Sequence, residues 1–100
     1  MEKYVTTLKQ AIRLKELAAC SKFPGNCPPY YIGELLEILP NEIDNGSHNF
    51  FLTKRGQLRG YSTVDGKHWL FCVQGTRTDA EAFGEVLIYL LEKNLIWKID

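Results

Sequence analysis

Net charge, long apolar segments and an export signal are all missing from this 100-residue chain. Twelve Lys and Arg residues balance twelve Asp and Glu residues, so there is no overall polycationic footprint for nucleic acid or anionic lipid. No apolar run approaches the ~20 residues that a membrane-spanning helix needs. Because the first residues are polar, we expect a cytoplasmic protein without membrane association.

Cysteine is scarce, and its pattern excludes the usual cysteine-based sites. Cys20, Cys27 and Cys72 are an odd number, and a reducing compartment favours free thiols. A Cys20–Cys27 disulfide is sterically possible, but the expected compartment argues against it. Neither the cysteines nor the histidines, His48 and His68, have the two-to-four-residue spacing of a zinc knuckle. The sequence therefore predicts no metal site and no cofactor.

Catalytic motifs are absent as well. The chain contains no nucleophile elbow, no glycine-rich dinucleotide fingerprint and no phosphate-loop lysine motif. Cys72 and His68 are the residue types of a thiol–imidazole pair, yet no third orienting group or oxyanion loop accompanies them. We predict a protein without enzymatic activity and without catalytic residues.

What the chain does contain is enough apolar material for one core. With 45% hydrophobic and 12% aromatic residues, it can fold as a single domain over residues 1–100. Thr7 and Gln10 have the spacing of a capping box, with Thr6 as a competing cap, which predicts a helix that begins there and ends near Cys20. A second, short helix is expected over residues 34–39, ended by Pro40.

The C-terminal helix has the clearest pattern. Thr78 and Glu81 form a second capping box. Apolar residues then recur at three- and four-residue spacing: Phe83, Val86, Leu87, Leu90 and Leu91. Ile88 and Tyr89 make this stripe wider than one sheet face requires, and the tail that carries Trp97 is too apolar to remain in solvent. Such patches mark partner sites, so we predict a protein-binding surface of Ile88, Tyr89 and Trp97 and a homodimer through it.

An alternative is that the short helix and Tyr30-Tyr31 cover these apolar side chains within one chain.

Residues 49–73 have the composition of an antiparallel meander. Asp65-Gly66 is a two-residue hairpin signal that pairs Val64 with Lys67. Counting outward places one set of residues on the core side: Leu58, Gly60 and Ser62, opposite Val73, Phe71 and Trp69. The open side receives the other set: Arg59, Tyr61 and Thr63, opposite Cys72, Leu70 and His68.

The preceding hairpin is expected to turn on Lys54-Arg55-Gly56, because Gly56 suits the left-handed position of a three-residue loop. That turn places Phe50 and Leu52 on the core side, with Phe51 alongside Arg59. The whole order predicts an α+β fold. A small three-stranded antiparallel meander is packed on one face by an N-terminal and a C-terminal helix, with a short middle helix.

Charge is distributed unevenly along the chain. Between Asn45 and Thr78, five basic residues face one acidic residue, a net charge of +4; the remainder carries −4. With Arg59, Tyr61 and His68 on the expected open face, the alternative function is weak single-stranded nucleic-acid binding. The simpler explanation is that basic residues protect exposed strands from edge pairing.

Four segments carry a resemblance: residues 4–8, 14–17, 35–40 and 85–94. They are similar to small uncharacterised proteins of Bacteroides-type gut bacteria and their phages or mobile elements. The resemblance implies a cytoplasmic accessory protein of phage or mobile-element origin, and it carries no activity, cofactor or site residue. Together with the residue patterns, it predicts a non-catalytic accessory protein that acts through protein–protein interaction.

Overall fold

Three helices and an antiparallel sheet make up the part of the chain that the computed structural model describes, namely residues 6–17, 30–44, 46–75, 78–93 and 95. The helices are α1 (Leu8–Glu16), α3 (Ile32–Ile38) and α4 (Asp79–Glu92). The strands are β1 (Glu42–Asp44), β2 (Asn49–Arg55), β3 (Leu58–Ser62) and β4 (Trp69–Val73). The α+β class is confirmed. The sheet has the order β1-β2-β3-β4, four strands rather than the predicted three.

Strand β1 is the element that the sequence pattern does not reveal. It pairs with β2, placing Ile43 opposite Phe50, and Ile43 is the residue of the strand that is buried. Three residues between Pro40 and a turn are too few to show an alternating pattern. The strand therefore forms because β2 has an edge with unpaired backbone groups, and the preceding segment of the same chain can form hydrogen bonds with them.

The β3–β4 register follows the prediction only at its first pair. Ser62 lies opposite Trp69 as expected, but a β-bulge follows, and Tyr61 pairs with Phe71 instead of Leu70. Side chains alternate between the two faces of a strand, so a one-residue shift changes which residues of two paired strands share a face. Phe71 and Val73 keep their predicted place on the core side, and Tyr61 joins them there. The prediction that Leu58, Gly60 and Ser62 face the core is thus wrong.

Gly60 lies beside this bulge and is tightly enclosed. A Cβ built at Gly60 would collide with the carbonyl oxygen of Phe71 and lie 2.8 Å from the Cα of Cys72. The absent side chain therefore lets the backbone of β4 come close, which is a recognised reason for glycine inside a strand.

The β2–β3 turn is shorter than predicted. Arg55 pairs with Leu58, so the turn consists of Gly56 and Gln57, and Gly56 has a φ of 60°. Phe50 is buried and Leu52 packs against the core, as the sequence predicts. Phe51, however, lies opposite Ser62 rather than alongside Arg59. The turn lies further along the chain than predicted, so the partner of Phe51 moves by three positions; because three is odd, the residues of β3 exchange faces relative to β2.

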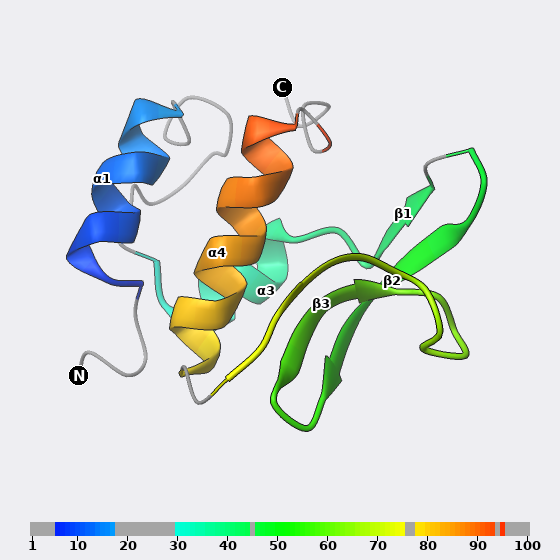
Figure 1. The fold of residues 1–100 in the computed structure, drawn as a ribbon. Helices are drawn as coiled ribbons and strands as arrows, with labels where there is room; N and C mark the ends of the chain where they lie inside the picture. Colours follow the sequence, from blue (N-terminus) through cyan, green and yellow to red (C-terminus); the bar gives the residue numbers. More distant parts are fainter. Residues whose placement is uncertain (1–5, 18–29, 45, 76–77, 94, 96–100) are drawn as a thin grey trace.

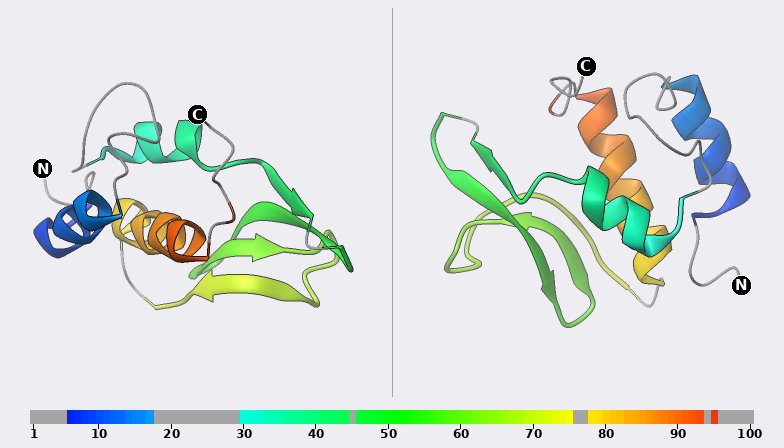
Figure 2. Two further views of the ribbon diagram at one scale, coloured as in Figure 1. Left: turned by 90° about the horizontal axis from the view of Figure 1, so that it is seen from above. Right: turned by 180° about the vertical axis from the view of Figure 1, so that it is seen from behind.

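Helix α4 is the centre of the fold. It packs on β3 and β4, while α1 and α3 pack on α4 (Figures 1 and 2). Nine of its 14 residues are buried, and a helix that is apolar on most sides belongs in an interior. The prediction that the N-terminal helix covers the sheet is wrong, because α4 lies between α1 and the strands. No helix in the described ranges is long and apolar enough to cross a membrane.

The first residues of α1 and α4 agree with the predicted capping residues. Thr7 caps α1 in a complete capping box with Gln10, and the Thr78 side chain accepts a hydrogen bond from the Glu81 amide. Helix α1 ends at Glu16, earlier than the predicted end near Cys20. Helix α3 begins two residues before the expected range and ends ahead of Pro40. Cys20 and Cys27 lie outside the described residues, so their pairing stays a prediction.

Candidate protein-binding groove

Gln10 fixes one end of α1 against α4. Its Oε1 accepts from the amide of Thr7, 3.0 Å away, which is half of the capping box. Its Nε2 donates to the carbonyl oxygen of Glu81 at 2.7 Å and to Oε2 of Glu85 at 2.8 Å. Gln10 is 4% exposed, so these hydrogen bonds satisfy polar atoms that would otherwise be buried at a cost. The residue therefore both caps its own helix and joins it to α4.

Gly84 permits the close approach of the two helices at this end. A Cβ at Gly84 would lie 2.8 Å from Cγ2 of Thr6 and 2.9 Å from Oε1 of Gln10, closer than side chains tolerate. The Thr6 side chain in turn accepts from the amide of Tyr30 at 3.0 Å. A larger residue at position 84 would push the start of α1 away from α4.

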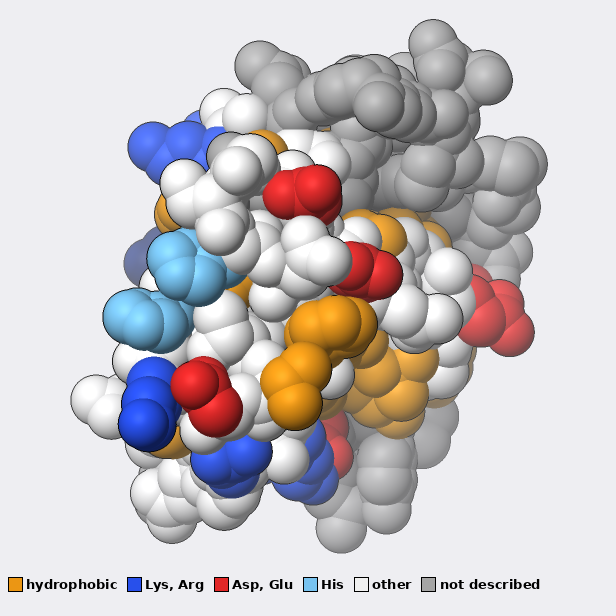
Figure 3. Space-filling model, turned by 90° about the vertical axis from the view of Figure 1, so that its right-hand side faces the viewer, with side chains coloured by type: hydrophobic (Ala, Val, Ile, Leu, Met, Phe, Trp, Pro, Cys, Tyr) orange, Lys and Arg blue, Asp and Glu red, His pale blue; other side chains and the backbone are white. Residues whose placement is uncertain are grey.

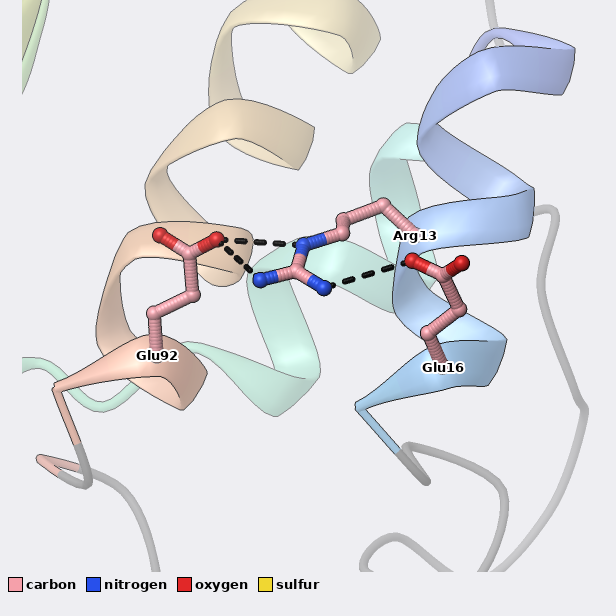
Figure 4. A network of polar contacts seen from close by, with 3 residues as sticks. All are labelled: Arg13, Glu16 and Glu92. Atoms are coloured by element: carbon pink, nitrogen blue, oxygen red, sulfur yellow. Dashed lines mark hydrogen bonds and ion pairs between the residues drawn. The ribbon is translucent and has the colours of Figure 1, made fainter.

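Arg13 joins the two helices at their other ends (Figure 4). Its Nη2 and Nε donate to Oε2 of Glu92 at 2.6 and 3.1 Å, and its Nη1 donates to Oε1 of Glu16 at 3.2 Å. The hydrogen bonds to Glu92 and then to Glu16 raise the pKa of Arg13 above its ordinary value. All three side chains are substantially exposed, so water screens these pairs, and their effect is to orient side chains more than to stabilise the fold.

An open groove of about 670 Å³ lies between these two connections. Ile12 and Ile88 are the apolar side chains of its lining. Its charged lining consists of four glutamates, one lysine and one arginine, a net charge of −2: Glu16, Glu81, Glu85, Glu92, Lys9 and Arg13. The groove therefore combines two apolar side chains with an acidic border.

Ile12 is the more exposed of these two apolar side chains. It is 54% exposed, and Leu8, one helical turn earlier, is 79% exposed. Residues four apart lie on the same side of a helix, so the two side chains form a short apolar strip along α1. A single exposed leucine is ordinary, but an exposed pair beside a groove marks a contact surface.

The structure divides the predicted protein-binding surface. Ile88 lines the groove and is 9% exposed. Tyr89 points to the sheet instead, where its ring stacks on Phe71 at 4.1 Å with an interplanar angle of 10°. Trp97 lies outside the described residues. The wide apolar stripe of α4 is thus covered within the chain, in line with the alternative of intrachain packing: the short helix α3 packs on α4 and Tyr30 is buried in the same core, while α1 and β4 pack on α4 as well.

The predicted nucleic-acid face is not assembled. Tyr61 is 0% exposed, and its hydroxyl donates to the carbonyl oxygen of Pro40 at 2.6 Å; burial raises its pKa well above the ordinary value. Arg59 is 9% exposed and forms an ion pair with Asp79 at 2.8 Å. Only His68 is exposed. The β-bulge explains this correction, since the extra residue in β4 places Phe71 and Val73 of the core side opposite Tyr61 and Arg59.

The thiol–imidazole pair is not assembled either. Cys72 is exposed and lies opposite Gly60, whereas His68 lies against His48, with ring centroids 4.8 Å apart. Among the described residues, no group of three or more His, Cys, Asp and Glu side chains could hold a metal ion.

Sequence reasoning identified Gln10 as a cap but missed its second role. Glu81, Glu85, Ile88 and Glu92 recur at intervals of four, three and four, which places them along one side of α4. That spacing was available as a signal of an acidic helix face. The sequence gives no signal that α1 lies beside this face, because that position depends on Gly84 and on tertiary packing.

Comparison with known proteins adds no identification. No family model, no curated protein and no solved structure matches this chain.

Proposed function

We propose that this chain is a non-catalytic accessory protein that binds another protein through the groove between α1 and α4. The observation that carries the proposal is the groove itself, in which exposed Ile12 and the neighbouring Ile88 lie within a border of glutamates. Apolar contact supplies most of the affinity of such surfaces, and charge complementarity supplies specificity and association rate.

The proposed partner is a positively charged amphipathic helix. A groove between two helices suits the helix-in-groove mode of recognition, in which apolar residues one turn apart enter the groove. Lysine or arginine side chains of the partner would meet the carboxylates of Glu81 and Glu85, which lie one turn apart on α4. An acidic or neutral helix would gain only the apolar contact.

A second copy of this chain fits the groove poorly. A two-fold contact places the same surface on both sides of an interface, so the four glutamates of each groove would face one another. Like charges across an interface cost several kcal/mol, roughly, and select against that pairing. The homodimer expected from the sequence stays a prediction, and the groove supports a different protein as partner.

A designed peptide pair tests the groove directly. One fluorescent helical peptide carries leucines on one side and lysines on the other, and its companion replaces the lysines with glutamines. We expect the lysine peptide to bind the full chain with an affinity that falls as salt rises, because exposed charges are screened. The glutamine peptide should bind at least about tenfold more weakly.

Matched double variants locate the binding. Ile12→Ser with Glu16→Gln alters the groove, and we expect at least a tenfold weaker affinity for the lysine peptide, since apolar contact and charge are both reduced. Leu36→Ser with Glu37→Gln makes the same changes on an exposed part of α3, outside the groove, and should leave the affinity unchanged. Equal losses in both variants, or no loss in either, would contradict the proposal.

Light scattering and a labelled single-stranded oligonucleotide separate the other functions. Growth of assemblies with concentration that Ile12→Ser with Glu16→Gln abolishes would show that a second copy occupies the groove, and would contradict a different partner. Oligonucleotide binding that weakens log-linearly with salt would favour the nucleic-acid alternative instead. We expect no assembly through the groove and no oligonucleotide binding at low salt.

A further inference from the structure

The two histidines of the chain, 20 positions apart in sequence, come together at one end of the sheet. His48 directly precedes β2 and His68 directly precedes β4. Because β3 pairs antiparallel with both strands, β2 and β4 begin at the same end of the sheet. They lie about 10 Å apart, a gap that two imidazole side chains can bridge. The two side chains adjoin on the surface of the protein (Figure 3).

The distance between the rings suits a shared ligand. Their centroids are 4.8 Å apart and their planes are inclined by 35°. Two imidazoles bound to one ion at metal–nitrogen distances of about 2.0–2.1 Å place their ring centres roughly 4.5–5.2 Å apart, for angles between square-planar and tetrahedral. The observed separation falls within that range, so the fold already holds the two rings at the spacing that a shared ion requires.

The backbone beneath His68 is well fixed. Its carbonyl oxygen accepts from the amide of Thr63 at 2.9 Å, and its amide donates to the Thr63 hydroxyl at 3.3 Å. Asp65, in the same loop, accepts from that hydroxyl at 2.6 Å and from the amide of Lys67 at 3.0 Å. A preorganised ligand position favours metal binding, since less conformational freedom is lost.

We propose that His48 and His68 form a binding site for one divalent transition-metal ion, of the class of Zn²⁺, Ni²⁺ and Cu²⁺. Imidazole is a preferred ligand for these ions, and the two loops expose both rings to solvent. Water completes the coordination, because the described residues offer no third protein ligand. The bound ion links the chain before β2 to the chain before β4 and so closes this end of the sheet.

Nuclear magnetic resonance of the full chain tests the site with Ni²⁺ as the probe. Since the chain contains two histidines, its spectrum has only two sets of imidazole ring signals, which His48→Asn and His68→Asn assign. We expect both sets to broaden together and to saturate at one ion per chain. Each single variant should weaken Ni²⁺ binding at least about tenfold, because the second ligand of a chelate binds at high effective concentration.

Thermal unfolding in Zn²⁺ gives an independent measurement. An ion that binds only the folded chain raises the melting temperature, so the wild type should gain several degrees that both histidine variants lack. Cys72→Ser is the control for thiol binding and should keep the full gain, since Cys72 is an exposed cysteine of β4. The proposal fails if the two ring signals respond at different Ni²⁺ concentrations, if a single variant binds as tightly as the wild type, or if Cys72→Ser abolishes binding.

Discussion

The two sides of α4 differ in how they hold the fold together. The side toward the sheet and α3 is apolar, with Leu90 fully buried and Tyr89 stacked on Phe71. The side toward α1 is mixed: Leu14 of α1 is fully buried in the core, while Gln10 bonds to the Glu81 carbonyl oxygen and the Glu85 side chain, and Arg13 reaches Glu92. Burial of apolar surface is the dominant stabilising contribution, whereas exposed polar pairs contribute little. The comparison indicates that the apolar contacts contribute most of the stability, whereas the exposed rim of the α1 side contributes little of it, as the proposed binding groove requires.

The exposed rim of the α1 side is therefore the better location for a binding surface. Substitutions of buried residues that stabilise the fold lower the free energy of unfolding, whereas substitutions of exposed Ile12 and Glu16 should change it little. This division leads to three stability predictions, ordered from the largest expected effect to the smallest.

Leu90→Ala should have the largest effect. Removal of a fully buried leucine leaves a cavity and loses apolar contact, so we expect the free energy of unfolding to fall by about 2–5 kcal/mol. Ile12→Ala, on the half-exposed side, should change it by less than about 0.5 kcal/mol. Urea denaturation measures both. Comparable losses in the two variants would remove the distinction between the sides of α4.

Asp79→Asn should have an intermediate effect that depends on pH. A hydrogen bond from Lys54, with Arg59 beside it, holds the pKa of Asp79 below its ordinary value. A lowered pKa means that the carboxylate stabilises the folded state above the unfolded-state pKa of about 4, and that this contribution disappears as pH falls through the lower folded value.

At neutral pH the wild type should exceed Asp79→Asn by about 1 kcal/mol or less, because Asp79 remains partly exposed to solvent. Below about pH 4 the two unfolding free energies should converge. Denaturation at a series of pH values checks this prediction, and a difference that grows on acidification would contradict it.

Gly84→Ala should have the smallest net effect and the most local one. Alanine adds up to about 1 kcal/mol of helix propensity to α4, but its Cβ would crowd Thr6 and Gln10. We expect a net change within about 1 kcal/mol, with faster amide hydrogen exchange in α1 and no change in α4. Gly33→Ala in α3 is the control, since nothing lies within 4 Å of its Cβ position, and it should leave exchange in α1 unchanged.

The elements that sequence reasoning recovered are those governed by local rules. The capping box of α1, the Thr78 cap of α4, the three helices and the strands around Asp65-Gly66 follow from side chains a few positions apart. The register beyond the bulge did not follow, because nothing in the residues from Trp69 to Phe71 shows which of them is unpaired. One misplaced residue then assigned Tyr61 to the wrong face.

The candidate sites divide in the same way. Ile88 was recognised from its position on a broad apolar stripe, and it does line the groove. The role of Gln10 between two helices and the meeting of His48 with His68 involve residues far apart in sequence. Their proximity depends on how the strands and helices pack, which periodicity does not encode.

Sequence alone determined where α1 and α4 begin, which side chains are apolar and how charge divides between residues 45–78 and the rest of the chain. Only the tertiary structure decided which faces meet: that α4 separates α1 from the sheet, and that Tyr61 is inside. The physical reason is one of range. Caps and turns are fixed by neighbouring hydrogen bonds, whereas packing depends on close approach between distant segments, as at Gly60 and Gly84.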